Sequence, residues 1–250
     1  MSVFHFKRFD VRNECSAMKV NTDGVLLGAS TTVLPGDRRI LDIGTGTGTV
    51  ALMLAQRMET DRDGGEWNIQ GIDIDAPSAE EAAGNFRQSP WQEHLESVNM
   101  GLAAFRKANP GACYDLIVSN PPYYDNSLQA PEARRNSARH TGDSENQESL
   151  SYREILEYAS EVLGEDGRVS MILPADQEKA LSRHARMCGF LPWKILRIKS
   201  VERKPVSRLR VQFKRRDKVG GSPLEEQLTL LDERGKRTSQ HASLVTDYCL

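Results

Sequence analysis

A turn built on alternate glycines, Gly44, Gly46 and Gly48, lies between two apolar segments and constrains the fold more than any other sequence feature. Residues 39–43 (RILDI) before it have the composition of a short buried strand, and residues 50–58 carry apolar side chains at helical spacing. Glycine lets the chain turn sharply and approach a ligand closely, and the following helix offers unpaired N–H groups. The pattern predicts a strand, a ligand-binding turn and a helix.

Segments typical of strands and helices continue to alternate, which indicates a mainly parallel sheet covered on both faces. Further strands are expected at residues 69–74, 97–100, 114–119 and 168–173, with helices at 78–86, 152–163 and 177–187. Residues 193–199 and 208–214 are strands without a helix between them, so we expect an antiparallel pair that closes one edge; residues 224–231 are a candidate for one more strand. The expected fold is α/β and Rossmann-like, with a mostly parallel seven-stranded sheet, an antiparallel edge and helices on both faces.

The composition excludes several classes of protein. No apolar run approaches the roughly 20 residues needed to span a bilayer, and the first residues (SVFHFKRFDVRNE) lack the apolar core of a signal peptide. The four cysteines (Cys15, Cys113, Cys188 and Cys249) are far apart and form no C-x-x-C pair, so neither a zinc site nor a disulfide framework is expected. We therefore expect a cytoplasmic monomer with no metal and no membrane contact.

An acid, Asp73, ends the second expected strand and is followed by Ile74. A carboxylate at this place can bind both hydroxyls of a ribose. The glycine spacing departs from the G-x-G-x-x-G fingerprint of dinucleotide-binding proteins, and Asp42, just before the glycines, would repel a pyrophosphate. A carboxylate suits a ligand with a cationic amine and a sulfonium, which favours S-adenosylmethionine over NAD.

Asn120, Pro121, Pro122 and Tyr123 follow the strand expected at residues 114–119. The prolines stiffen the backbone and remove two N–H donors, which leaves the Asn120 side-chain oxygen and the Pro121 carbonyl as fixed acceptors. Two acceptors can hold both hydrogens of an exocyclic NH₂ and pull its nitrogen toward a tetrahedral shape, so that its lone pair can attack a methyl group. Tyr123 can stack on a flat base. The quartet indicates methyl transfer to a planar amino nitrogen, with a plain turn as the alternative.

These motifs resemble those of known families. Residues 42–48 resemble the first motif of class I S-adenosylmethionine-dependent methyltransferases, D-x-G-x-G-x-G, and the quartet is similar to the N-P-P-Y motif of amino methyltransferases, which act on adenine N6, cytosine N4, guanine N2 or a glutamine amide. Residues 16–29 (SAMKVNTDGVLLGA), with the quartet and Arg139-His140, resemble the bacterial tRNA adenine-N6 methyltransferases that modify the adenine beside the anticodon of a valine tRNA. This resemblance implies a class I methyltransferase fold, S-adenosylmethionine as cofactor and tRNA as partner.

The resemblance also implies a set of cofactor-binding residues. In that family the Lys-x-x-Thr-Asp segment folds over the cofactor, although Asp23 is equally suited to cap a helix that begins at Gly24. Many methyltransferases place an acid or amide after the third strand; residues 99–102 supply no acid here, and a role for Asn99 stays open. The expected cofactor contacts are Lys19, Thr22, Asp23, Asp42, Gly44, Thr45, Gly46, Gly48, Asp73, Ile74 and Asn120.

Positive charge is concentrated late in the chain. Residues 179–218 hold fourteen Lys or Arg against two acids, while the whole chain has a net charge of −2. A polyanionic partner explains such a local surplus, and a solvated strand surface is the alternative. The polar, aperiodic loop at residues 129–148 adds further cations and is long enough to be functional or disordered. The expected RNA contacts are Arg134, Arg135, Arg139, Lys199, Arg203, Lys204 and Arg208, with Arg210 along the same edge.

One methyltransferase domain is expected, with residues 1–36 covering cofactor and substrate, 37–216 forming the catalytic core and 217–250 an extension. A glutamine amide of a release factor is the second candidate acceptor, but such enzymes usually carry a helical N-terminal domain, and 41 residues precede Asp42. Guanine N2 of ribosomal RNA is a third candidate. A non-catalytic RNA-binding module is the alternative from another class, and the acids at 42 and 73 together with Asn120 disfavour it.

Overall fold

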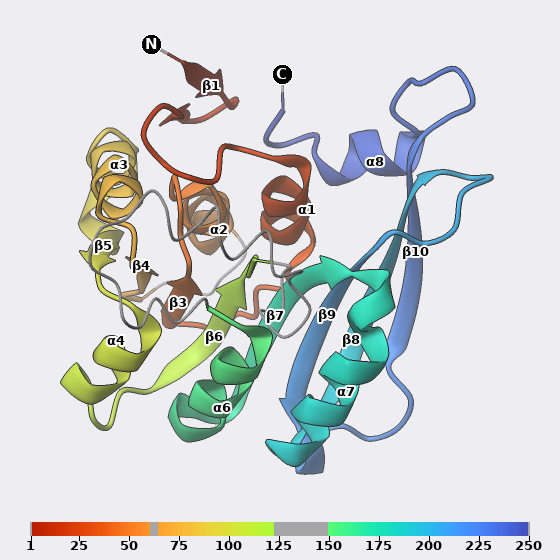
Figure 1. Ribbon diagram of the computed structural model, residues 1–250. Coiled ribbons are helices and arrows are strands. Elements are labelled where there is room, and N and C mark those ends of the chain that lie inside the picture. Colours follow the sequence, from red (N-terminus) through yellow and green to blue (C-terminus); the bar gives the residue numbers. More distant parts are fainter. Residues whose placement is uncertain (1, 61–64, 123–149, 250) are drawn as a thin grey trace, which may run out of the picture.

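One twisted sheet runs through the molecule, in the part described by the computed structural model, which is residues 2–60, 65–122 and 150–249. Its strands are β3 (Arg39–Ile43), β4 (Asn68–Asp73), β5 (Leu95–Asn99), β6 (Tyr114–Ser119), β7 (Leu163–Pro174), β8 (Phe190–Val201), β9 (Arg208–Arg215) and β10 (Leu224–Leu231). They lie in the order β10-β8-β9-β7-β6-β3-β4-β5 (Figure 1). All neighbours are parallel except β9, which is antiparallel to both β7 and β8.

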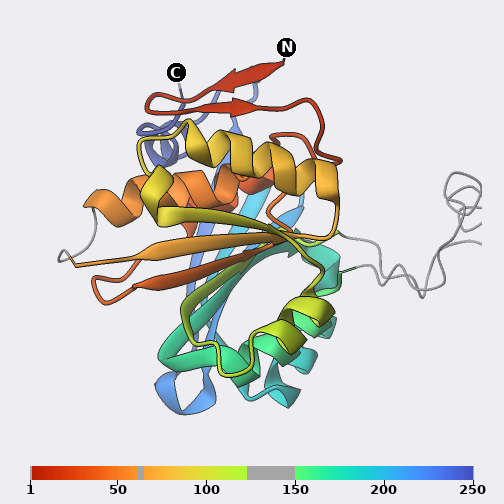
Figure 2. The same ribbon diagram turned by 90° about the vertical axis from the view of Figure 1, so that its left-hand side faces the viewer.

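Helices cover both faces of this sheet, as the edge-on view in Figure 2 shows. They are α1 (Thr22–Ser30), α2 (Thr49–Thr60), α3 (Ala76–Arg87), α4 (Leu102–Ala108), α6 (Tyr152–Val162), α7 (Glu178–Met187) and α8 (Ser239–Leu244). One apolar core joins α1, α2, α3 and α8 to the sheet, and the other joins α4, α6 and α7. Successive strand residues alternate between them: Leu116 and Val118 belong to the first core and Ile117 to the second. Among the described residues, no helix is both long and apolar enough to span a membrane.

The expected fold class is confirmed, but two details of the sheet were wrong. The sheet has eight described strands instead of seven, and the antiparallel pair does not close its edge. β10 pairs in parallel with β8 along residues 194–201 and forms the outer strand. The first four of its eight side chains are exposed, three of them polar, so the strand has no strong apolar pattern in the sequence, although it satisfies the backbone groups that β8 would otherwise leave open.

Three elements were not expected from the sequence. A hairpin of β1 (Val3–His5) and β2 (Asp10–Arg12) lies over one helical layer (Figure 1), where Phe6 stacks on Phe9 with ring centroids 4.5 Å apart. Phe6 also forms a bridge with Cys249, which joins the two ends of the chain. Helices α4 and α8 were missed because seven and six residues are too few for a helical period to show.

A buried ion pair fastens the segment before β3 to β7. The Arg168 side chain is fully buried, and its guanidinium donates to both carboxylate oxygens of Asp37 and to the carbonyl oxygen of Thr32. Asp37 is also buried and accepts the backbone N–H of Leu34 at 2.8 Å. The pair thereby fixes the position of the chain where β3 begins, and β3 leads to the glycine turn.

Candidate active site

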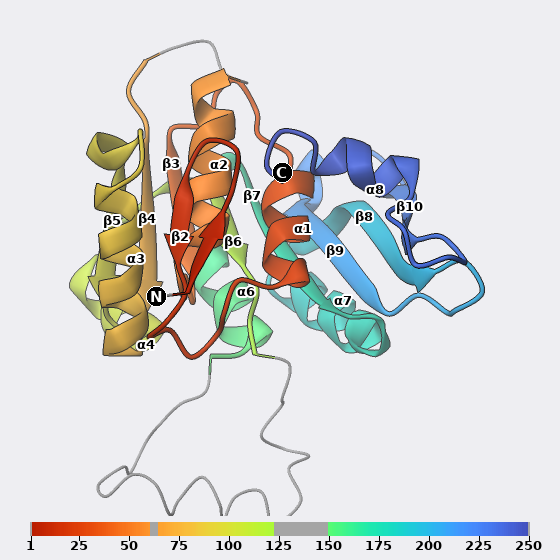
Figure 3. The same cartoon turned by 90° about the horizontal axis from the view of Figure 1, so that it is seen from above.

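The ends of three neighbouring strands bring the predicted site residues together. β3 lies between β4 and β6 in the sheet and is parallel to both, so the residues that follow Asp42, Asp73 and Ser119 lie at the same end of the sheet. The sheet order reverses its direction at β3, and ligands of open α/β sheets bind at such a switch point. Figure 3, viewed from above, shows that β6 ends on the side of the molecule where α1 begins. The Ser119 hydroxyl donates to the Ile43 carbonyl at 2.7 Å and ties β6 to β3.

The glycine turn has the backbone conformation that its sequence predicts. Gly44, Gly46 and Gly48 have φ values of 72°, 56° and 80°, in the left-handed region that favours glycine. A Cβ on Gly48 would collide with the ring of Phe86, so α3 packs directly against the turn. Gly44 is exposed and Gly46 half-buried; a Cβ on Gly44 would lie 3.2 Å from the side chain of Leu150, and one on Gly46 would lie 3.5 Å from the hydroxyl of Ser16.

Asp42 lies beneath the turn and not in the open site. Its side chain is 1% exposed, and one carboxylate oxygen accepts the hydroxyl of Thr45 at 2.8 Å. Burial raises the pKa of Asp42 to about 7, while the hydrogen bond from Thr45 lowers it and the charge of Asp73 raises it further. Its burial excludes direct contact with a ligand above the turn, so we propose that Asp42 acts through the charge of its ionised form.

Asp73 is better placed for direct contact. Its two carboxylate oxygens accept the N–H groups of Gly46 and Asp75, each at 2.9 Å. A carboxylate oxygen has two lone pairs, so both oxygens keep acceptor capacity for a pair of ribose hydroxyls. Burial raises the pKa of Asp73, and the two N–H groups counteract it. Ile74, 62% exposed, follows as an apolar surface for a flat ring, while Asn99 donates its amide to the carbonyls of residues 73 and 74 and braces them.

Asn120 stands at the end of β6 and is oriented by a neighbour from the N-terminal segment. Its side-chain Nδ2 donates to the sulfur of Met18 at 3.6 Å, so this end of the amide points at Met18. Pro121 is buried and Pro122 exposed. Tyr123, the last of the predicted quartet, lies outside the described residues.

A strap, residues 13–21, crosses the mouth of the site and is held by α3. The Glu81 carboxylate accepts three successive backbone N–H groups, those of Glu14 at 2.6 Å, Cys15 at 2.9 Å and Ser16 at 2.8 Å. These hydrogen bonds lower the pKa of Glu81 against the opposing effect of burial. The Ser16 hydroxyl also lies 3.0 Å from that of Ser78 on α3. The strap then reaches the turn, where the Met18 carbonyl would be 3.7 Å from a Cβ on Gly46.

The expected cofactor contacts on and after the strap have other contacts as well. The Lys19 ammonium is exposed and donates to the carbonyl of Glu14, and Thr22 is the exposed first residue of α1. Asp23 forms an ion pair with Arg208 at 2.9 Å. The alternative interpretation of Asp23 as a helix cap is wrong: Asn21 is the N-cap, and its side chain accepts the N–H of Gly24 at 2.8 Å.

The expected RNA contacts, with Arg210 beside them, divide into four groups. Arg203 and Lys204 are exposed on the loop between β8 and β9, at the site end of the sheet, and Arg203 forms an exposed ion pair with Glu233 at 3.7 Å. Lys199 and Arg208 reach the same end but already pair with Glu202 and Asp23. The expectation that Arg210 lies with these RNA contacts is wrong, because Arg210 is 3% exposed and faces the α1 layer, where it contacts Ser30. The expected contacts Arg134, Arg135 and Arg139 lie outside the described residues.

Sequence reasoning gave no role to Met18 or Glu81. Met18 lies inside the segment that resembles the family, yet a methionine there is indistinguishable from an ordinary apolar contact. Glu81 is one of two adjacent acids on a helix, where an acid usually faces solvent. Only the path of the strap over α3 reveals these roles.

A family model described as a methyltransferase domain matches residues 40–141. A protein of Photorhabdus laumondii named tRNA1(Val) (adenine(37)-N6)-methyltransferase is 36% identical over 247 residues, covering 99% of this chain and 95% of its own length. The chain belongs to the family of tRNA1(Val) (adenine(37)-N6)-methyltransferases. A Bacteroides fragilis protein of the same name is 40% identical over 210 residues, with 84% and 83% covered. A predicted O-methyltransferase from Agrobacterium tumefaciens, 15% identical with a TM-score of 0.63 over 90% of this chain and 96% of its own, shares the fold.

S-adenosylmethionine is the methyl donor of this methyltransferase, and the site has the features to hold it. The turn is exposed at Gly44, Asp73 keeps acceptor capacity, and Ile74 offers an exposed apolar surface. The carboxylate of Asp73, and that of Asp42 when it is ionised, suit the cationic amine and the sulfonium of this ligand. The residues present therefore fit the cofactor.

The raised pKa of Asp42 predicts that cofactor binding depends on pH. Because the pKa of Asp42 is higher in the folded than in the unfolded chain, this group stabilises the fold at low pH and loses that contribution as pH rises through its pKa. Cofactor binding depends on pH in the opposite sense, because a cationic ligand prefers the carboxylate, which predominates above about pH 7. Calorimetry should show cofactor affinity falling about tenfold from about pH 8 to about pH 6. Asp42→Asn should reduce this dependence, and an equal pH slope in that variant would contradict the assignment.

Proposed function

We propose that this chain transfers a methyl group from S-adenosylmethionine to the exocyclic N6 of an adenine in tRNA, at position 37 of a valine tRNA as its relatives are named. The observation that supports this most is the placement of Asn120 and Pro121 at the end of β6, beside the glycine turn at the end of β3. The proposed acceptors for the amino group and the proposed binding site of the methyl donor thus lie at the same end of the sheet, where these parallel strands end.

The roles of the residues follow from their hydrogen-bonding capacity. The adenine amino group has two hydrogens, which the Asn120 side-chain oxygen and the Pro121 carbonyl would accept. Because Nδ2 of Asn120 donates to Met18, the amide oxygen points the other way and is positioned as an acceptor. When bound, S-adenosylmethionine supplies an electrophilic methyl group on a cationic sulfur. No strong base is needed, since the methylated nitrogen sheds its proton readily, and Tyr123 would stack on the base.

Residues 1–36 act in this proposal as the segment that covers the site, residues 37–216 as the catalytic core and residues 217–250 as an extension. The strap joins the first two because it touches both Asn120 and α3. Cofactor and adenine would lie between the strap and the strand ends. Lys19, Thr22 and Asp23 are then contacts at the rim.

Replacement of Glu81 by glutamine should loosen the strap. A neutral amide accepts the N–H groups of residues 14–16 more weakly than a carboxylate, and its NH₂ end repels a donor. We expect KM for the cofactor to rise about tenfold, near the low end for lost hydrogen bonds to a charged group. Steady-state kinetics measures this, and Glu80→Gln, at the exposed neighbour on the same helix, is the control. Equal KM values in the two variants would contradict a role for Glu81 in positioning the strap.

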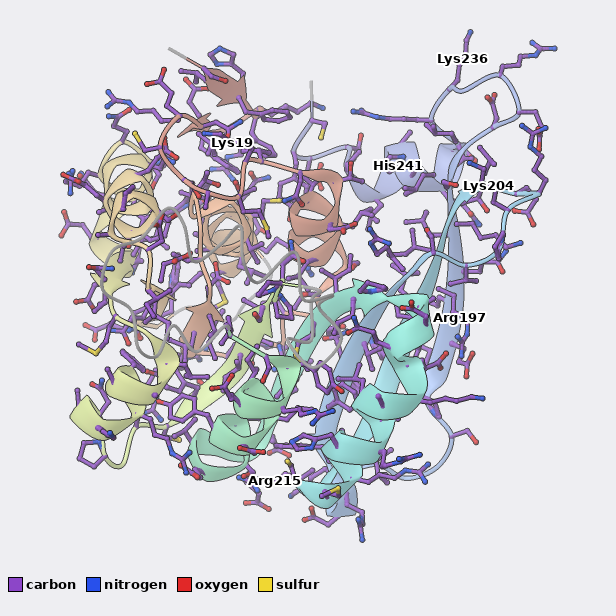
Figure 4. The ribbon with its side chains drawn as sticks, viewed as in Figure 1. Lys19, Arg197, Lys204, Arg215, Lys236 and His241 are labelled. Carbon is purple, nitrogen blue, oxygen red and sulfur yellow. The ribbon has the colours of Figure 1, made fainter. Side chains whose placement is uncertain are left out.

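Charge reversal at Arg203 and Lys204 should weaken RNA binding. The parallel pairing of Leu231 with Val201 places the turn after β10 beside this loop. Figure 4 shows Lys204 and Lys236 on these two loops, both beyond the end of the sheet. The double variant Arg203→Glu with Lys204→Glu is expected to lower tRNA affinity about tenfold or more. The slope of log affinity against log salt concentration should also become shallower, by the equivalent of about two phosphate contacts. Filter binding across a salt series tests this, with Lys179→Glu and Arg183→Glu on α7 as the control pair.

The adenine acceptor is tested with two valine tRNA transcripts that differ at position 37. The chain should methylate the transcript with adenine and leave the transcript with inosine, which lacks the amino group, unmethylated. Equal labelling of both would contradict the proposal. Guanine N2 of ribosomal RNA and a glutamine amide are the other acceptors of such sites, and the same assay with ribosomal RNA and release factor as substrates should give no transfer.

A further inference from the structure

A cavity of about 560 Å³ lies on the helical face of the sheet that α1 and α8 cover, away from the glycine turn. Its wall is formed by the end of α1, Arg57 of α2, the strands β8, β9 and β10, and α8; Figure 1 shows where these elements lie. Leu196, Leu228 and Leu244 give it an apolar side, and Arg57 and Arg210 give it a basic side. Such a mixture, at this volume, is typical of sites for small ligands.

Arg210 is the unusual member of this wall. Its side chain is 3% exposed; Nε donates to the Ser30 hydroxyl at 3.1 Å, but Nη1 is buried with no hydrogen-bond partner. Burial lowers the pKa of Arg210 to about 10, while the charge of Glu226 raises it and that of Arg57 lowers it. A buried cationic donor without a partner is costly, so this position suits an anion that the protein itself does not supply.

The second guanidinium strengthens the argument. Arg57 donates to the carbonyl of Thr31 and lies near enough to Arg210 for mutual repulsion. Glu226 is the acid in the described lining, but it is exposed, and no described ion pair joins it to Arg210. Lys194, whose pKa is lowered chiefly by burial and also by the charge of Arg210, adds to the positive field. Like charges gathered this way in a partly buried wall are stabilised when an anion lies between them.

We propose that this cavity binds a phosphate group, held by the guanidinium groups of Arg210 and Arg57 with its organic part against the three leucines. Guanidinium groups match the geometry of phosphate oxygens and are less strongly hydrated than ammonium groups. The site is separate from the catalytic edge, because α1 runs its nine residues from Thr22, near the strap, to Ser30 at the cavity. The ligand is a small phosphate compound or a phosphate of bound RNA, and the proposal does not depend on the methyl acceptor.

Calorimetry with inorganic phosphate tests the proposal, with S-adenosylhomocysteine present in excess to block the catalytic site. The wild-type chain should bind phosphate saturably, and Arg210→Met should weaken this binding about tenfold or more, because the charge-assisted contacts are lost. Glu226→Gln should tighten it severalfold, since it removes the competing negative charge. Arg183→Met, at an exposed residue of α7 outside the cavity, should bind phosphate like wild type.

The contrary results are equally definite. Failure of the wild-type chain to bind phosphate, or equal binding by wild type and Arg210→Met, would overturn the proposal. If Arg210→Met does not fold, the Glu226→Gln variant decides, and an affinity equal to or below that of wild type refutes the site. A short RNA without terminal phosphates identifies the source: competition with phosphate indicates an RNA phosphate, and its absence together with phosphate binding indicates a small ligand.

Discussion

An Asn120→Ala variant is expected to lose methyl transfer by about 10²-fold to 10³-fold in kcat, the range for removing one preorganised polar group from a transition state. The side-chain oxygen is one of two acceptors proposed for the adenine amino group, and alanine offers none. In the proposed site the cofactor is held mainly by the strand ends at residues 42 and 73, so its affinity should stay close to that of wild type. Single-turnover kinetics measures the first quantity and calorimetry the second.

Met18 allows a sharper version of this experiment. Met18→Leu keeps the volume but removes the sulfur that accepts Nδ2 of Asn120, so the amide can rotate and its oxygen is aimed less well. We expect a smaller loss in kcat than for Asn120→Ala, with unchanged cofactor affinity. If Asn120→Ala keeps the wild-type rate, the proposed chemistry is wrong; if Met18→Leu alone keeps it, the orienting contact is unimportant.

An Arg168→Met variant should show the largest loss of stability. The substitution leaves the carboxylate of Asp37 buried without its partner, and breaking a buried pair in this way costs about 3–5 kcal/mol. Urea unfolding should therefore show a large fall in the free energy of unfolding. The double variant Arg168→Met with Asp37→Asn should recover part of the loss because no charge remains buried.

The matched control is Arg183→Met, at an exposed arginine on α7, which should change stability by less than about 0.5 kcal/mol. If Arg168→Met unfolds at the same urea concentration as this control, the pair between β7 and the segment before β3 contributes no net stability. Activity is a separate readout, since Arg168 has no proposed part in the chemistry.

The sequence predicted best what depends on local chemistry. The bounds of β3 and β6 agree with the structure residue for residue, because each is a short apolar run that ends in a turn. The glycines at 44, 46 and 48 were informative since only a special backbone conformation requires them. Family membership and cofactor followed from the same local motifs.

Features that depend on distant parts of the chain were missed or misplaced. Arg208 and Arg210 look equivalent in the sequence, yet Arg208 reaches an acid on α1 at the site end, and Arg210 is buried two residues further along β9. The pairing of β10 with β8 and the contacts of Glu81 with the strap likewise join segments far apart in the chain. No local pattern encodes such partners.

The most direct test of the account is mass spectrometry of tRNA nucleosides after reaction of the wild-type chain with unmodified valine tRNA and isotopically labelled S-adenosylmethionine. The account predicts labelled N6-methyladenosine at adenine 37, and none when Asn120→Ala replaces the wild type. Label found on another nucleoside, or undiminished N6-methyladenosine with the variant, would contradict it.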